Sequence, residues 1–372
     1  MTPMASTEED RISELPDSIL CHILSFLPTE LAVKTSVLSK RWKPIWLSVP
    51  TFNMFDYFSD HAVCSVMQSR DDNLPLLLFR LLCSDPEIFN SLIISATQRG
   101  VQTLEFDLLL VSLEMKTLSN ILTCKTLTVL KLTMVSIKEY VPEINVSSSI
   151  KTLDLDSVHF KSEKHVISFF LAFPGVEELR TNKVCVYGKP KAILSTRGII
   201  KYFPNLLRAN ISDTQLIPFF SHSKELVLNI NKKPRLKNVQ LPMFFNLTQM
   251  ELVFKRWHSK WELIVKMLPQ SPNLQHLIIH EEEKENKNGI NDKNWEDPEI
   301  VPECLSSRLR TCLFRCYRGL KCDVKFVEYV MRNSKVLGIM TIQCSSSIDV
   351  NKKNEILQQL SVCPRGCKLL FD

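Results

Sequence analysis

Glycine is scarce in this sequence, which has only eight glycines among 372 residues. Phosphate-binding loops use glycine where the backbone approaches a ligand closely or adopts a positive φ. The sequence also contains no P-loop, no G-x-S-x-G nucleophile motif and no H-E-x-x-H metalloprotease motif. These absences argue against a nucleotide-binding enzyme and against the common hydrolase classes.

Long hydrophobic runs are absent as well. The apolar segment 74–83 is interrupted by Pro75 and Arg80, whereas a helix that spans a membrane needs about 18 or more apolar residues. The first ten residues end in three acidic residues and contain no apolar stretch, so they do not resemble a leader peptide. We expect a protein of the nucleus, the cytoplasm or both, in which the twelve cysteines are free thiols.

Neither sign of charge dominates, because 46 lysines and arginines face 40 aspartates and glutamates, for a net charge of +6. This balance does not indicate a dedicated nucleic-acid binder. The four cysteines between Cys304 and Cys322 lack the C-x2-C spacing of structural zinc, and the pair Cys363 and Cys367 has no histidine nearby. We therefore predict no metal, no cofactor and no catalytic site; an enzyme with an unrecognised cysteine nucleophile is the alternative.

Residues 10–50 have a dense helical pattern. A stripe of apolar residues with helical spacing follows Pro16 and ends at Pro28. Thr29 is expected to cap a second helix, and a third is expected to carry Trp42 and Trp46 on one face, with Pro44 disturbing its last turn. Three short helices bury too little apolar surface to be stable alone. The stripe must therefore pack against either the following domain of the same chain or an external partner.

Three runs in this region resemble the plant form of the F-box: DRISELPD at 10–17, ILSFLPT at 23–29 and TSVLSKRW at 35–42. The resemblance implies a three-helix domain that docks onto the Skp-type adaptor of an SCF ubiquitin ligase, and through it onto cullin and RING subunits. Carried over position by position, the implied adaptor-binding residues are Leu15, Pro16, Ile19, Leu20, Ile23, Leu24, Leu27, Val33, Leu38 and Trp42.

A short apolar pattern recurs further along the chain, and its central leucines are Leu104, Leu130, Leu153 and Leu179. Their spacing lies within the period of leucine-rich repeats, which is roughly 20–29 residues. The pattern predicts an α/β fold: an irregular leucine-rich-repeat solenoid with a parallel sheet on the concave face and helices on the convex face. An ordinary α/β core is the alternative. The repeats resemble those of plant F-box/leucine-rich-repeat proteins.

The carboxyl-terminal part begins after an acidic stretch, in which eight acidic residues and three lysines lie between 281 and 299. The segments VPECL at 301–305, FVEYV at 326–330 and VLGIMTI at 336–342 then resemble the FBD domain. We predict a strand, a helix and a strand that extend and cap the solenoid. A basic run at 308–335 has eight cations against two acidic residues; we interpret it as a solvated face, with an acidic protein or RNA partner as the alternative.

The predicted organisation is an F-box at 10–56, a linker at 57–73, leucine-rich repeats at 74–280, an acidic loop at 281–294 and an FBD-like domain at 295–372. The resemblance implies a non-catalytic substrate receptor of an SCF-type ubiquitin ligase, without a membrane or nucleic-acid partner. The alternative is an interaction scaffold that does not promote ubiquitination. The sequence does not identify the protein target; strand positions that alternate with core residues and are candidates to face it are Glu105, Lys131, Asp154 and Arg180.

Overall fold

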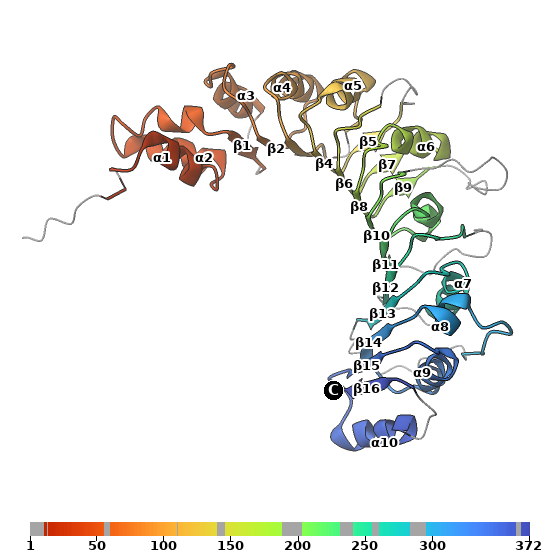
Figure 1. Ribbon diagram of the computed structural model, residues 1–372. Coiled ribbons are helices and arrows are strands. Elements are labelled where there is room, and N and C mark those ends of the chain that lie inside the picture. Colours follow the sequence, from red (N-terminus) through yellow and green to blue (C-terminus); the bar gives the residue numbers. More distant parts are fainter. Residues whose placement is uncertain are drawn as a thin grey trace, which may run out of the picture. The chain divides into compact units, whose positions relative to one another are not determined.

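The computed structural model divides the chain into two compact units, residues 1–140 and 141–372. Figure 1 shows its helices and strands in chain order. The described residues are 11–12, 14–55, 60–109, 111–139, 146–187, 203–230, 241–254, 260–282, 295–361 and 366–372. Most of the segment predicted as an acidic loop, 283–294, lies outside them. Within these ranges no helix combines the length and the apolar character that crossing a membrane requires.

The first unit begins with short helices. They are the α-helices α1 (Asp17–Leu24) and α2 (Thr29–Lys34) and the 3-10 helices η1 (Thr35–Val37) and η2 (Ile45–Ser48). The expected third helix is not continuous, because turns occupy residues 40–44 and only the short η2 follows. Pro44 explains the interruption, since its ring nitrogen cannot donate a helical hydrogen bond.

Four parallel strands follow in the first unit, in the order β1 (Thr51–Met54), β2 (Leu78–Leu82), β3 (Thr103–Asp107) and β4 (Val129–Thr133). The helices between them are α3 (Asp60–Gln68), α4 (Pro86–Gln98) and α5 (Met115–Thr123), and a short strand β5 (Ser136–Ile137) comes last. The register places Phe52 beside Phe79 and Leu104 beside Leu130, all buried. The segment 57–73, predicted as a linker, therefore contains a helix, and the sheet starts about one repeat before residue 74.

The second unit continues with parallel strands. In sheet order they are β6 (Thr152–Asp156), β8 (Glu178–Asn182), β10 (Arg208–Ile211), β11 (Glu225–Ile230), β12 (Gln249–Phe254), β13 (His276–Glu281), β14 (Thr311–Tyr317), β15 (Ile339–Cys344) and β16 (Lys368–Phe371). Leu153 and Leu179 pair in register, as do Met250 and Leu277, and each is buried. These pairs confirm the predicted repeat, because equivalent leucines stack on one face of a parallel sheet.

Helices cover one face of the sheet in the second unit and leave the other open (Figure 1). They are α6 (Glu163–Leu171), η3 (Thr214–Phe220), α7 (Lys260–Met267), α8 (Glu303–Ser307), α9 (Lys321–Asn333) and α10 (Val350–Ser361); the short strands β7 (His159–Phe160) and β9 (Cys185–Val186) form a separate pair. The strand, helix and strand predicted after residue 309 are present as β14, α9 and β15, and they extend the same sheet.

A buried charge cluster joins the last repeats to the carboxyl-terminal segment. The ammonium of Lys260, at the start of α7, donates to Asp323 at the start of α9, 2.6 Å away, and also to Glu281 at the end of β13. Arg318 donates to the second oxygen of Glu281 at 2.9 Å. Glu281 was expected in a solvated loop; it is instead a buried strand residue, because two cations compensate its charge.

Candidate functional site

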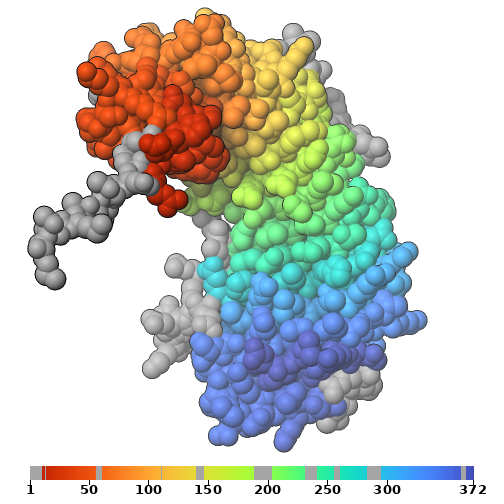
Figure 2. Space-filling model, turned by 60° about the vertical axis from the view of Figure 1, so that its left-hand side comes forward, coloured from red at the N-terminus to blue at the C-terminus, as the bar shows by residue number. Residues whose placement is uncertain are grey.

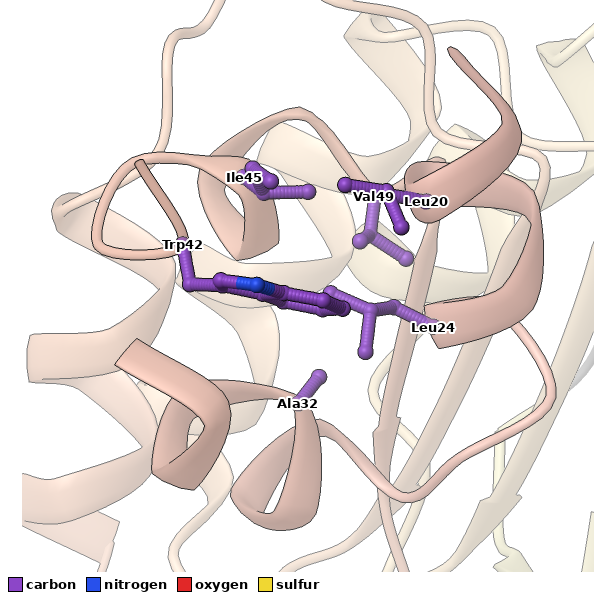
Figure 3. Close-up of a cluster of buried hydrophobic side chains, with 6 residues drawn as sticks. All are labelled: Leu20, Leu24, Ala32, Trp42, Ile45 and Val49. Carbon is purple, nitrogen blue, oxygen red and sulfur yellow. The ribbon is translucent and has the colours of Figure 1, made fainter. Parts of the chain in front are cut away.

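The helices of residues 15–49 enclose a small core of their own (Figure 3). The indole of Trp42 lies flat in this core, with Ala32 on one side and Ile45 on the other, and its far edge points to Leu24. The buried cluster consists of Leu20, Leu24, Ala32, Trp42, Ile45 and Val49. Burying side chains of this size stabilises a domain by about 1.5–3 kcal/mol each, so this cluster holds the short helices together.

A second set of apolar side chains in the same helices faces solvent. Phe26 keeps 75% of its surface exposed and Val37 keeps 85%. The full set is Ile12, Ile19, Ile23, Phe26, Leu31, Val37 and Leu38. Single exposed apolar residues are ordinary, but this many within residues 12–38 is a high concentration for one domain, and exposed apolar surface is typical of protein interaction sites; we call this set the exposed apolar patch. Figure 2 shows these helices in red beside the orange first repeat of the same unit.

The structure separates the ten sequence-predicted residues into three groups. The exposed residues are Pro16, Ile19, Ile23 and Leu38; the half-buried residues are Leu15, Leu27 and Val33; the buried residues are Leu20, Leu24 and Trp42. The side chains of the buried group form the core of the domain and are covered in this structure, and the binding role of the ten residues stays a prediction. The exposed group remains available.

Sequence reasoning missed Ile12, Phe26, Leu31 and Val37 as surface residues. Along α1 and the turn that follows it the stripe is broader than one face: positions 19, 23 and 26 form one row, and positions 20, 24 and 27 form the next. Both rows have helical spacing, so periodicity alone does not show which row is the core. The row that begins at Leu20 packs inside, and the row that begins at Ile19 faces solvent.

The start of α1 is held by Arg41. Its guanidinium donates to the carboxylate of Asp17 at 2.8 Å and to the backbone carbonyl of Leu15. The Arg41 side chain is 39% exposed and that of Asp17 is 70% exposed, so the ion pair itself adds little stability. Its effect is geometric, because it keeps the Leu15–Pro16 segment against the turn that carries Trp42.

Two hydrogen bonds connect the helical head, residues 15–49, to strand β1, and a third holds β1 to the segment after α3. The backbone N–H of Asn53 donates to the hydroxyl of Thr29 at 2.7 Å, and the hydroxyl of Thr51 donates to the carbonyl of Ser25 at 3.3 Å. Arg70, which is buried, donates to the carbonyl of Thr51 at 2.9 Å. The expected capping role of Thr29 is therefore wrong, since its hydroxyl accepts from β1 and makes no cap to α2. Hydrogen bonds therefore hold the helical head to strand β1 of the first repeat.

On the open face of the sheet, charged residues pair across neighbouring strands. In the first unit Glu105 accepts from Arg80 at 3.0 Å and from Lys131 at 3.3 Å. In the second unit Arg208 lies 2.9 Å from both Glu178 and Glu225. Cross-strand pairs of this kind contribute roughly 0.2–1 kcal/mol each. They present alternating positive and negative charge on the open face.

Two buried cysteines, Cys304 and Cys312, do not have the properties of a nucleophile. Burial raises the pKa of the Cys304 thiol to about 12 and that of Cys312 to about 12, so both stay protonated at neutral pH. A reactive cysteine needs the opposite shift. In the part of the chain that the structure describes, no group of three or more histidines, cysteines or carboxylates is arranged to hold a metal ion.

Comparison with known proteins gives two domain matches. Residues 12–53 match the F-box domain, a range that includes the helical head and most of strand β1. Residues 296–342 match the FBD domain, which includes α8, β14, α9 and most of β15. F-box domains in general bind Skp-type adaptors, and the exposed apolar patch lies within the matched F-box residues.

Similar proteins cover nearly the whole chain. The chain is 28% identical to the F-box/FBD/LRR-repeat protein At3g52680 of Arabidopsis thaliana, over 98% of this chain and 93% of that protein. It is also 28% identical to the FBD-associated F-box protein At5g56370 of the same plant, over 97% of this chain and all of that protein. The chain thus combines an F-box, leucine-rich repeats and an FBD domain. Over nearly its whole length it is similar to F-box/FBD/LRR-repeat proteins of Arabidopsis thaliana.

Proposed function

We propose that this protein is a substrate receptor of an SCF-type ubiquitin ligase, and that its F-box binds a Skp-type adaptor through the exposed apolar patch. The observation that carries the proposal is the division of the α1 stripe: one row builds the core, while Ile19, Ile23 and Phe26 remain in solvent. Exposed apolar side chains gain free energy when a partner covers them, at about 25 cal/mol for each Å² buried. Leu15, Pro16, Leu27, Val33 and Leu38 border this surface in the proposal.

The target would bind to the repeats and the FBD domain. Sheet positions on the open face present charged and polar side chains, among them Asp154 and Arg180, next to a rigid parallel sheet. Rigid elements present side chains in a fixed arrangement, which limits the entropy lost on binding. The receptor itself does no bond chemistry in this proposal. It raises the effective concentration of target lysines near the activated ubiquitin.

Co-purification tests the adaptor interaction. The full chain is co-expressed with a Skp-type adaptor, next to a variant with Phe26→Ser and Val37→Ser. Phe245→Ser serves as the matched control, because Phe245 is 63% exposed and lies outside the F-box. We expect a stable complex with the wild type and the control, and loss of the complex in the F-box variant. Equal recovery of all three chains would contradict the proposed binding surface.

Ubiquitin transfer separates the receptor from an interaction scaffold. The adaptor complex is combined with cullin, RING subunit, ubiquitin-conjugating enzyme and ubiquitin, and modification of lysines on this chain is followed. A receptor brings its own lysines near the conjugating enzyme, so we expect ubiquitin chains that disappear in the Phe26→Ser, Val37→Ser variant. Adaptor binding without any transfer would favour the scaffold. We further propose a nuclear or cytoplasmic location, which a fluorescent fusion tests.

A further inference from the structure

The structure divides the eight cations of the basic run 308–335 into groups with different surroundings. Arg315 and Arg318 are half-buried and lie near carboxylates of neighbouring strands. Three more are exposed on helix α9: Lys321, Lys325 and Arg332. The remaining three, Arg308, Arg310 and Lys335, are exposed in the turns that lead into β14 and β15.

The turn cations lie at the amino-terminal ends of strands β14, β15 and β16, which are neighbours in the sheet (Figure 1). The backbone N–H of Gly338 donates to the carbonyl of Arg310 at 2.8 Å, and the N–H of Lys368 donates to the carbonyl of Gly338 at 2.8 Å. Neighbouring strands are about 4.8 Å apart. Lys368 is exposed and adds a fourth cation that the sequence pattern did not connect with the run.

Exposed aliphatic side chains lie between these cations. Val336 is 48% exposed, Ile339 is 38% exposed and Leu370 is 39% exposed. Ile339 is the register partner of Lys368, and Leu370 follows two residues later on the same face of β16. Gly338 keeps the backbone accessible, since a Cβ there would meet only the carbonyl oxygen of Arg310, at 3.6 Å. We name this surface the basic aliphatic edge; it consists of Arg308, Arg310, Lys335, Val336, Gly338, Ile339, Lys368 and Leu370.

The cations of the basic aliphatic edge are not neutralised by any residue that the structure describes. Across the described ranges, none of its four cations forms an ion pair, in contrast to Arg315 on β14 and Arg318 in the turn after it. Clustered unpaired cations create a positive potential that attracts acidic groups. The exposed aliphatic side chains on the adjoining strands β15 and β16 offer burial to an apolar side chain of a partner. The two properties together specify a partner that is both acidic and aliphatic.

We propose that the basic aliphatic edge binds a peptide segment of the target protein in which aliphatic side chains alternate with aspartate or glutamate. The identity of the partner as a target rests on the proposed function. Charge complementarity selects an acidic segment, and Val336, Ile339 and Leu370 select aliphatic residues within it. The edge contains no aromatic side chain on which bases could stack, and single-stranded nucleic acids are bound largely by such stacking. A protein segment therefore fits this surface better than RNA.

Fluorescence anisotropy with the full chain tests the proposal. The probe is a set of short labelled peptides in which Leu, Ile or Val alternates with Asp or Glu; the reference peptides carry Ser in place of the aliphatic residues, and a short single-stranded RNA is the third probe. We expect the acidic aliphatic peptides to bind about tenfold more tightly than the serine peptides or the RNA, since apolar contacts and charge act together. Ile339→Ser with Leu370→Ser should remove that difference.

Charge reversal provides the second test. Arg310→Glu with Lys335→Glu should weaken peptide binding about tenfold or more, whereas Lys321→Glu with Lys325→Glu, with the same change of charge on α9, should change it less than about twofold. Arg310→Gln with Lys335→Gln replaces the reversal if thermal unfolding shows that the reversed chain does not fold. Equal loss in the α9 control, tighter binding of RNA, or no binding of any peptide would overturn the proposal.

The outcome is independent of the adaptor experiment, because the edge lies outside the F-box. If the chain co-purifies with the adaptor but does not bind the peptides, this inference is refuted and the proposed function is unaffected. A chain that binds the peptides through the edge but no adaptor refutes the proposed function, and leaves the edge as a peptide-binding site.

Discussion

The ammonium of Lys260 lies 2.6 Å from the carboxylate of Asp323, and both side chains are buried. Asp323 also accepts the backbone N–H of Leu320 at 3.2 Å, so the same carboxylate caps the first turn of α9. The pair connects the helix before β13 to the helix after β14. It thereby fixes the position of α9, in the FBD domain, relative to α7. Apolar contacts alone would allow small shifts between these helices.

Lys260→Met should destabilise the second unit strongly. The substitution removes the cation that Glu281 and Asp323 share; Glu281 keeps its pair with Arg318, whereas Asp323 loses the pair with Lys260. Breaking a buried ion pair typically costs about 3–5 kcal/mol. Lys266→Met is the matched control on the same helix, because the Lys266 pair with Glu262 is exposed and should change stability by less than about 0.5 kcal/mol. Thermal unfolding measures both; similar midpoints for the two variants would contradict the assigned role of Lys260.

Core and surface variants of the F-box should have opposite effects. Trp42→Ala should cost about 3–5 kcal/mol of stability, because it empties the centre of the small core. Leu38→Ser, at a residue 63% exposed, should cost less than about 0.5 kcal/mol and yet weaken adaptor binding. Thermal unfolding and adaptor co-purification are measured on the same preparations. Unchanged adaptor binding by the Leu38→Ser variant would show that Leu38 is not part of the proposed adaptor-binding surface.

Two glycines in the second unit should respond differently to alanine. A Cβ at Gly175 would collide with the backbone carbonyl of Ser148, whose carbon lies 2.8 Å away, and backbone atoms cannot rotate aside as a side chain can. We expect Gly175→Ala to cost about 1–3 kcal/mol, the usual range for overpacking. Gly338→Ala is the control, with its nearest neighbour at 3.6 Å. Urea unfolding compares the two variants, and equal midpoints would argue against this contact.

Alkaline pH should destabilise the second unit through its buried thiols. Burial holds the pKa of Cys304 and of Cys312 at about 12, against an ordinary pKa of 9.0. The raised pKa belongs to the folded state. Each protonated thiol therefore makes its full contribution to the free energy of unfolding below pH 9, and this contribution is lost as the pH rises from 9 to 12. The expected loss is about 1.4 kcal/mol for each thiol at pH 10.

Urea unfolding at pH 8 and at pH 10 tests the alkaline effect. Cys304→Ala with Cys312→Ala should reduce the difference between the two pH values, even though the substitutions themselves lower stability at both. Cys185→Ala is the control, because Cys185 is exposed. A difference that persists unchanged in the double variant would assign the alkaline effect to other groups.

The repeats were predictable because a strand buried on one face alternates with period two. Leu153 and Leu155 are separated by one half-exposed residue, and the same pattern recurs at a nearly constant interval. The weakly patterned segments 206–211 and 224–230 nevertheless form β10 and β11, because their neighbours supply the register. Strand β1 escaped prediction because its four residues, TFNM, are too short to show alternation.

The charge cluster at Lys260 was not predictable from local pattern. Lys260 is 21 residues from Glu281 and 63 residues from Asp323. Glu281 begins an acidic run, and composition places such runs in solvent. Only the fold brings a compensating cation to it. The same reason explains why Lys368, far beyond Lys335 in the sequence, joins the basic aliphatic edge.

The hydrogen bond from Asn53 to Thr29 affects how this chain could be divided or recombined. Cutting after η2 at Ser48 would leave the Thr29 hydroxyl and the Ser25 carbonyl without their partners in β1. An F-box borrowed for a chimeric receptor should therefore carry residues through Met54, together with a strand able to pair with β1. In this protein the natural unit of exchange is the F-box plus its first repeat.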